Sequence, residues 1–98
     1  MNDVVSDIYV EWDDDKNIIN QRKHGISFFT AALIFADENR IEYYDNLHST
    51  DEDRYVVIGL VKKVLFVVYT IRKESIRLIS ARMATPTERK VYYGEYEG

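Results

Sequence analysis

One stretch decides the fold of this chain: Ser75-Ile76-Arg77-Leu78-Ile79-Ser80-Ala81-Arg82-Met83-Ala84-Thr85-Pro86-Thr87-Glu88-Arg89. It begins as an apolar β-strand and continues as a helix. Thr85 is the expected N-cap, because Pro86 stands at the first helical position and Glu88 completes a capping box three residues after the cap. The corner between strand and helix carries a cluster of arginines. Such a corner is either structural, with the arginines lying over the sheet edge, or a surface that offers positive charge to a phosphate.

Three further strands are expected before this one. Residues 54–61 and 64–72 are rich in β-branched and aromatic side chains and are separated only by two lysines, so they predict a hairpin. Lys73-Glu74 provides a tight turn into the strand at 75–82, and residues 40–45 form the fourth strand. The order of these segments predicts an antiparallel four-stranded meander.

The N-terminal third predicts a strand followed by two helices. Residues 8–12 alternate in the manner of a strand with one buried face. A helix is expected over 14–24, with Asp13 as its N-cap and Gly25 ending it in the left-handed conformation. Ser27 caps a second helix, which is apolar nearly all round and should be largely buried.

The predicted fold class is therefore α+β, in the order β-α-α-β-β-β-β-α and as a single domain over residues 1–98. The N-terminal strand accompanies the meander, and the helices are expected to pack on one face.

The composition is that of a small folded protein without disulfide bonds. The 98 residues include 46% hydrophobic residues and no cysteine, so packing alone must hold the core, and the chain suits a reducing compartment. No segment approaches the ~18 apolar residues of a membrane span, and the N-terminus lacks the basic start and apolar run of a signal peptide. We therefore expect a cytoplasmic protein without membrane contact.

Charge is divided unevenly along the chain. Residues 1–53 carry 4 basic and 13 acidic side chains, whereas residues 54–98 carry 9 basic and 4 acidic ones. If the second half forms one face, that face can bind phosphate locally while the acidic half meets a basic partner. The alternative is that the asymmetry averages out in the folded structure.

Four blocks of sequence together resemble the BrnT family. They are Trp12-Asp13-x-x-Lys16-Asn17, Asn20-x-x-Lys23-His24-Gly25-Ile26-Ser27-Phe28, Arg54 with Ile58-Gly59, and Arg77-x-Ile79-Ser80-Ala81-Arg82-x-Ala84-Thr85-x-x-Glu88-Arg89-x-x-Tyr92. The resemblance implies a ribonuclease toxin of a type II toxin-antitoxin system, with a fold similar to that of the RelE superfamily. It also implies a DNA-binding BrnA-like antitoxin as partner, so that operator DNA is contacted only through the antitoxin.

RNA cleavage without a metal needs groups that move two protons, and fixed positive charge at the phosphate. In view of the resemblance, the candidate catalytic residues are Lys23, His24, Arg72 and Arg82. The imidazole of His24 is a side chain that can act as acid or base, although its alternative role is to interact with the dipole at a helix end. Arg82 ends its strand and can hold two phosphate oxygens. Arg72 joins it only if the register brings the two strand ends together.

Arg77, Arg89, Tyr55 and Tyr69 are the expected RNA-binding residues. Strand alternation places Arg77 on the side opposite Arg82, so the two arginines need not act together. The tyrosines can stack on unpaired bases, although a strand tyrosine is more often a residue at the edge of the core. Glu88 is interpreted as structural, because it is the expected partner in the capping box.

No cofactor and no metal site are expected. The chain has no cysteine and only two histidines, which argues against a transition-metal site. Three carboxylates follow one another in Asp51-Glu52-Asp53. Consecutive residues rarely bind the same ion, so we interpret this segment as a solvated acidic loop.

The sequence and the resemblance together predict a metal-independent endoribonuclease that cleaves RNA and inhibits translation and growth. The alternative is a noncatalytic module that binds its antitoxin and acts mainly in repression of the operon. The acidic half of the chain favours this alternative, because a basic antitoxin segment would find a complementary surface there.

Overall fold

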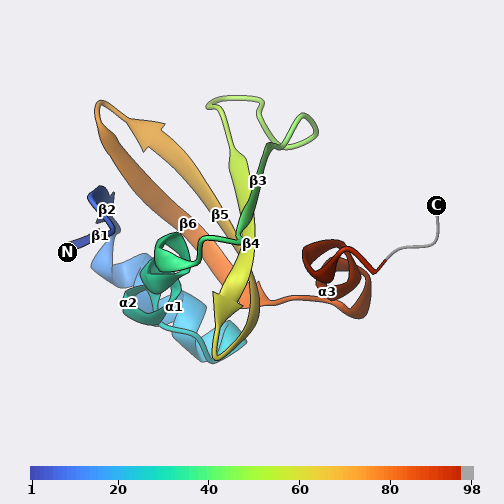
Figure 1. Cartoon of the computed structure of the whole chain (residues 1–98). Coiled ribbons are helices and arrows are strands. Elements are labelled where there is room, and N and C mark those ends of the chain that lie inside the picture. The colour runs from blue at the N-terminus through green and yellow to red at the C-terminus, as the bar shows by residue number, and fades with distance from the viewer. Residues whose placement is uncertain (96–98) are drawn as a thin grey trace.

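The computed structural model describes residues 1–95, which form a six-stranded sheet flanked by helices (Figure 1). The strands stand in the order β1-β2-β6-β5-β4-β3. Their bounds are β1 (Asn2–Val5), β2 (Ile8–Glu11), β3 (Ile41–Tyr44), β4 (Tyr55–Val61), β5 (Lys63–Arg72) and β6 (Ser75–Met83). The helical segments are α1 (Asp14–His24), α2 (Phe28–Ala32), the 3₁₀ helix η1 (Leu33–Ala36) and α3 (Pro86–Tyr93).

Strands β3 to β6 lie side by side in chain order, and each is antiparallel to the next. Lys62 and Lys73 occupy the tight turns that precede β5 and β6, and both have left-handed backbone conformations, with φ of 63° and 56°. The observed bounds of β4, β5 and β6 differ from the predicted ones by one residue at either end at most.

Strand β1 was not predicted. It forms an antiparallel hairpin with β2, and the turn residues Ser6 and Asp7 have φ of 49° and 67°. Glycine and asparagine usually occupy such turns, so this turn carries no sequence signal. β2 then runs parallel to β6, beginning at the pair Val10 and Ile76. The N-terminal strand predicted over 8–12 is therefore part of the same sheet, with one more strand outside it.

The two faces of the sheet are covered by different helices, which corrects the expectation that all helices pack on one face. α1, α2 and η1 lie over the face that carries Val57 and Leu78, whereas Tyr92 of α3 packs on the opposite face. The cause is visible in β4, where Val56, Val57 and Ile58 are all buried. Successive strand residues point to opposite faces, so both faces of β4 require a cover.

The second helix is shorter than its apolar sequence predicts. The Ser27 hydroxyl caps α2 by accepting a hydrogen bond from the Thr30 N–H at 3.1 Å, as expected. The helix then tightens into η1 at Leu33. Phe29 and Leu33 are exposed, so the segment is buried on one side only, through Phe28, Ala31, Ala32, Ile34 and Phe35.

A β-bulge in β6 changes which of its side chains share a face. Val68 of β5 lies opposite Ser80, but the next residue, Tyr69, lies opposite Leu78, so Ile79 is the extra residue. The bulge reverses the side-chain alternation that a regular strand would have.

Arg77 and Arg82 consequently lie on the same face, against the expectation that they point to opposite sides. Directly opposed residues of antiparallel strands share a face. Arg82 lies opposite Phe66 and Arg77 opposite Thr70, an even number of residues apart on β5. We call this face, opposite α1 and α2, the outer face, and the face under α1 and α2 the inner face.

Gly59 of β4 generates a prediction about this packing. A Cβ atom on Gly59 would lie 2.5 Å from Cγ1 of Ile34 in η1, which is closer than two carbon atoms can stand. We expect Gly59→Ala to lower the free energy of unfolding by about 1–3 kcal/mol in urea denaturation. Ile34→Ala removes the obstructing atom, so the double variant should lose less than the sum of the two single losses. If the two single losses of stability simply add in the double variant, the contact with Ile34 is not the cause of the loss in Gly59→Ala.

Candidate functional site

Arg82 lies at the corner where β6 leads toward α3, and its guanidinium is held on several sides. Nη1 and Nη2 donate to the two carboxylate oxygens of Glu88 at 2.7 and 3.0 Å, and Nη1 also donates to the Met83 carbonyl at 3.1 Å. The guanidinium lies over the Phe66 ring, 4.0 Å from its centroid. A bidentate ion pair combined with a cation–π contact fixes the orientation of the arginine.

Glu88 joins this arginine to the first turn of α3. Its carboxylate accepts the Thr85 N–H at 2.8 Å, and the Thr85 hydroxyl accepts the Glu88 N–H at 3.2 Å, so the predicted capping box is present. Burial acts to raise the pKa of Glu88, but the hydrogen bonds from Arg82 and Thr85 outweigh it and lower that pKa. The bond to Glu88 raises the pKa of Arg82. The pair is therefore ionised at neutral pH.

Tyr43 of β3 belongs to the same corner, although no motif in the sequence singles it out. It lies opposite Val56 and so points to the outer face, with 45% of its surface exposed. Burial and the carboxylate of Glu88 raise the pKa of its hydroxyl. Only the pairing of β3 with β4 brings this tyrosine toward Arg82.

A second group of polar side chains lies where α1 passes the edge of β6. A cleft of about 190 Å³ is lined there by Lys16, Lys23 and His24 of α1 and by Ser80 of β6, together with Ile19, Asn20 and Ile79. Lys16 and Lys23 are seven residues apart, which places them on the same side of a helix. Two lysines and a histidine around a small hollow make a site suited to an anion.

Asn20 positions this cleft. It is the buried residue of α1, and its carboxamide bonds the backbone of Ala81 on both sides, donating from Nδ2 to the carbonyl at 2.9 Å and accepting the N–H at Oδ1 at 3.0 Å. Nδ2 also donates to the Ile26 carbonyl at 2.9 Å. β2 ends at Glu11, so Asn20 takes the place of a neighbouring strand at this point of the β6 edge.

Ser80 connects the two groups. It lines the cleft beside His24, and it stands two residues before Arg82 on the outer face. The structure thus brings Lys23, His24 and Arg82 to one end of β6.

Arg72 does not join this group. It lies opposite Ser75, at the end of β6 farthest from Arg82, and its Nη2 is 3.6 Å from a carboxylate oxygen of Glu52. Phe66, which lies opposite Arg82, is six residues from Arg72 along β5. At ~3.3 Å per residue this is a separation of roughly 20 Å. The register therefore separates the two strand ends that the catalytic prediction required to be close.

The two arginines predicted to bind RNA lie on the outer face, in the case of Arg77, and on α3, in the case of Arg89. Arg77 is partly buried, with its Nη1 3.9 Å from a carboxylate oxygen of Glu11. Arg89 is exposed and donates from Nη1 to the Ala84 carbonyl at 3.3 Å.

Tyr69 and Tyr55 lie on the inner face, away from the arginines. Tyr69 is only 5% exposed, its hydroxyl donates to Glu42 at 2.9 Å, and its ring packs between Phe35 and Tyr55, with centroids 5.6 and 5.5 Å away. The core thus occupies the ring of Tyr69, and its predicted stacking on a base is wrong. Tyr55 is half-buried, stacked on Tyr69 and in contact with Tyr44.

The acidic loop forms contacts with protein groups. Glu52 pairs with Arg72, and Asp53 accepts the Tyr44 hydroxyl at 2.9 Å. Among residues 1–95, no three side chains of the kinds that bind metals are grouped to hold an ion. In the same part of the chain, no helix is long and apolar enough to cross a membrane.

Comparisons with known proteins bear on the family and the fold. Residues 12–88 match the family model described as "Ribonuclease toxin, BrnT, of type II toxin-antitoxin system". The crystal structure of the Brucella abortus ribonuclease toxin, BrnT, superposes with a TM-score of 0.58 at 20% sequence identity, covering 85% of this chain and 99% of that chain. No curated protein matches the sequence.

The class defined by these findings is that of the ribonuclease toxins of type II toxin-antitoxin systems. The match extends over most of the chain, and the solved relative has the same mixed α and β fold. The chain therefore belongs to the BrnT family. Membership implies an RNA substrate and an antitoxin partner.

The end of α3 is attached through Asp37, which follows η1. Its Oδ2 accepts the Tyr92 hydroxyl at 2.5 Å and the Leu60 N–H at 2.8 Å. Burial acts to raise the pKa of Asp37, but these hydrogen bonds, led by that of Tyr92, outweigh it and lower the pKa. The same contact contributes, after burial, to raising the pKa of Tyr92 to about 12.

Acid should therefore loosen α3 before the rest of the chain. Folding lowers the pKa values of Asp37 and Glu88 below those of the unfolded chain, which lie near ~4. The stability that the two carboxylates contribute is therefore complete above the unfolded pKa values, and it is lost as the pH falls through the folded ones. Hydrogen exchange should show α3 losing protection below about pH 4 while β5 keeps it. Asp37→Asn should weaken this pH dependence. Simultaneous loss of protection in α3 and β5 would contradict the assignment.

Proposed function

We propose that this BrnT-family toxin is a metal-independent endoribonuclease that acts in the cytoplasm, where cleavage of RNA inhibits translation and growth. The observation that carries the proposal is the series of basic and hydroxyl side chains at one end of β6, from Lys23 and His24 through Ser80 to Arg82. A DNA-binding antitoxin of the BrnA kind is the proposed inhibitor, and operator DNA is contacted through it alone.

The proposed reaction uses the 2′-hydroxyl of the RNA as nucleophile. Its oxygen attacks the adjacent phosphorus and loses a proton to a base, the bond from phosphorus to the 5′-oxygen breaks, and an acid protonates that leaving oxygen. The products are a 2′,3′-cyclic phosphate and a free 5′-hydroxyl. His24 is the proposed proton-transfer residue, because an imidazole can give or take a proton near neutral pH. Lys23, beside it in the cleft, supplies positive charge for the phosphate.

Arg82 is the proposed stabiliser of the charge that develops on the phosphate. A guanidinium has five N–H groups. Two of them bind Glu88 and one binds the Met83 carbonyl, which leaves the Nε–H and one N–H of Nη2 for a ligand within the described structure. Glu88 acts here as a positioning residue, since it orients those two donors before RNA arrives. Arg77 and Arg89 are the proposed contacts to neighbouring phosphates.

The noncatalytic alternative also rests on an observation. Three of the arginines proposed from the sequence already have carboxylate partners, since Arg72 pairs with Glu52, Arg77 with Glu11 and Arg82 with Glu88. Such neutralised arginines suit a protein that only binds its antitoxin and helps to repress the operon. Expression of the wild type without antitoxin distinguishes the two, because the noncatalytic protein leaves growth unaffected.

The direct test is cleavage of a generic single-stranded RNA in excess EDTA. We expect the wild type to cleave and Arg82→Ala to lose about 10²–10³-fold in rate, as for loss of one preorganised donor at a developing charge. Arg22→Ala is the matched control, because Arg22 is an exposed arginine of α1 outside the site. A folded wild type that cleaves neither with nor without EDTA would refute the nuclease proposal. Cleavage that occurs without EDTA but not with it would refute independence from metal.

A pH–rate profile tests His24. Its substitution by alanine should lower the rate by about 10²–10⁴-fold and remove one limb of the profile. The chain contains a matched control in His48, an exposed histidine 2.8 Å from Asp45 in a distant loop, whose substitution should leave the profile unchanged. An unaltered profile in His24→Ala would exclude this histidine from proton transfer.

A further inference from the structure

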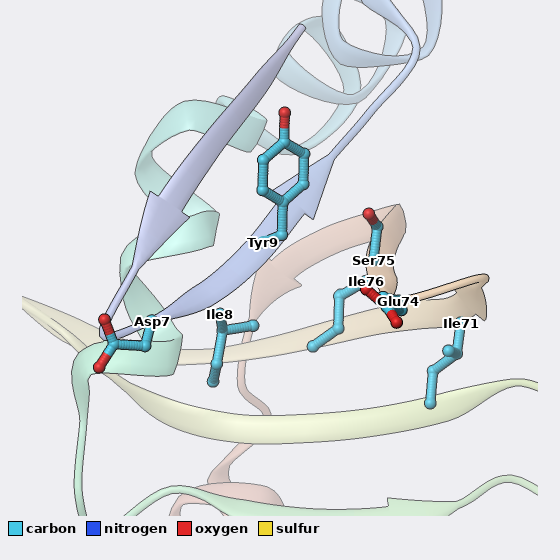
Figure 2. Close-up of a pocket in the computed structure, with 7 residues that line it drawn as sticks. All are labelled: Asp7, Ile8, Tyr9, Ile71, Glu74, Ser75 and Ile76. Atoms are coloured by element: carbon cyan, nitrogen blue, oxygen red, sulfur yellow. The ribbon is translucent and has the colours of Figure 1, made fainter.

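A second, larger cleft lies between the β1–β2 hairpin and the β5–β6 hairpin. β2 and β6 are paired only at Val10 with Ile76 and at Glu11 with Arg77, and before these pairs the two hairpins separate. The space between them measures about 610 Å³ and is lined by Asp7, Ile8, Tyr9, Ile71, Glu74, Ser75 and Ile76 (Figure 2). None of these residues belongs to the proposed nuclease site.

Aliphatic side chains form one side of this cleft. Figure 2 shows Ile8, Ile71 and Ile76 projecting toward the same side of the sheet, with Tyr9 on the other. Ile8 and Ile76 are partly buried against the inner-face core, whereas Ile71 is 53% exposed. The row thus extends the core to the surface without a cover. An exposed aliphatic row of this kind favours contact with another apolar side chain.

The charged groups that line the cleft are both acidic. Asp7 lies in the turn between β1 and β2, and Glu74 in the turn between β5 and β6. Both are exposed, and neither forms an ion pair within residues 1–95. Lys73 is adjacent to Glu74 but does not line the cleft. Two free carboxylates repel the phosphates of RNA and attract Lys or Arg side chains, so charge selects a basic peptide as the occupant.

The backbone adds a reason for an extended peptide. Ile8 and Tyr9 pair with β1 on one side only, because the pairing with β6 begins at Val10. A strand with one unpaired edge can bind an extended segment through main-chain hydrogen bonds, while pockets select alternate side chains. The cleft offers such an edge next to its aliphatic row.

We infer that this cleft is a docking site for an extended segment of the antitoxin in which aliphatic side chains are flanked by Lys or Arg. The inference rests on the proposed function only for the identity of the partner. It divides the molecule into two working surfaces, with RNA at the α1 end of β6 and the peptide at the hairpin end.

The test is an NMR titration of the full chain with two capped peptides, Lys-Ile-Val-Ile-Lys and Glu-Ile-Val-Ile-Glu. We expect the basic peptide to shift the amides of Ile8, Tyr9 and Ile76 and to bind at least tenfold more tightly than the acidic one. The double variant Asp7→Lys with Glu74→Lys should reverse this preference. The inference is overturned if the peptide shifts none of these amides, or if the charge reversal has no effect on the preference. Binding of a single-stranded RNA in the cleft would also overturn it.

A matched pair of variants separates this inference from the nuclease proposal. Ile71→Asp places a charge in the aliphatic row and should abolish peptide binding while RNA cleavage stays at the wild-type rate. Leu47→Asp changes a leucine that is exposed in the β3–β4 loop, and it should alter neither. Retained peptide binding in Ile71→Asp overturns the docking site whatever the nuclease assay shows. A wild type that binds the peptide but cleaves no RNA overturns the proposed function and leaves the docking site standing.

Discussion

The carboxamide of Asn20 holds the first helix to the sheet, and the proposed active site depends on that attachment. α1 has little apolar surface to bury, and its buried side chain is this polar one. Asn20 forms hydrogen bonds with both the N–H and the carbonyl of Ala81. These backbone groups of β6 have no partner on β2, because the pairing of the two strands ends at Glu11 and Arg77. Leaving such buried groups without partners costs about 1–3 kcal/mol each, so the contact fixes both the helix and the cleft in front of it.

The elements that could be predicted from the sequence are those with local causes. The caps at Asp13, Ser27 and Thr85 and the end of α1 at Gly25 depend on residues a few positions apart, and all four are observed. What could not be predicted depends on distant pairings. The β1–β2 turn lacks glycine, the parallel contact of β2 with β6 joins residues far apart in sequence, and the bulge at Ile79 follows from how β6 fits β5.

The same division explains the site. Lys23 and His24 lie in a cleft because they stand in the last turn of a helix whose bounds were correctly predicted. Arg72 and Arg82 both lie at the ends of strands, but the antiparallel pairing of β5 with β6 puts them at opposite ends of the hairpin. A single extra residue in β6 decides that Arg77 shares a face with Arg82. For Tyr69 the sequence allowed either stacking on a base or a place at the edge of the core, and the residue lies beneath η1, where Phe35 covers its ring.

The burial of β4 on both faces makes the short helix α3 important to the survival of the toxin in a cell. α3 is attached by one carboxylate at its first turn and by a tyrosine hydroxyl at its last. Its departure would uncover Val56, Ile58 and Val64, a strand-borne apolar strip of the kind that chaperones and proteases recognise in partly unfolded chains. We therefore expect the half-life of the free toxin against proteolysis to depend on these few terminal contacts as well as on the stability of the main core.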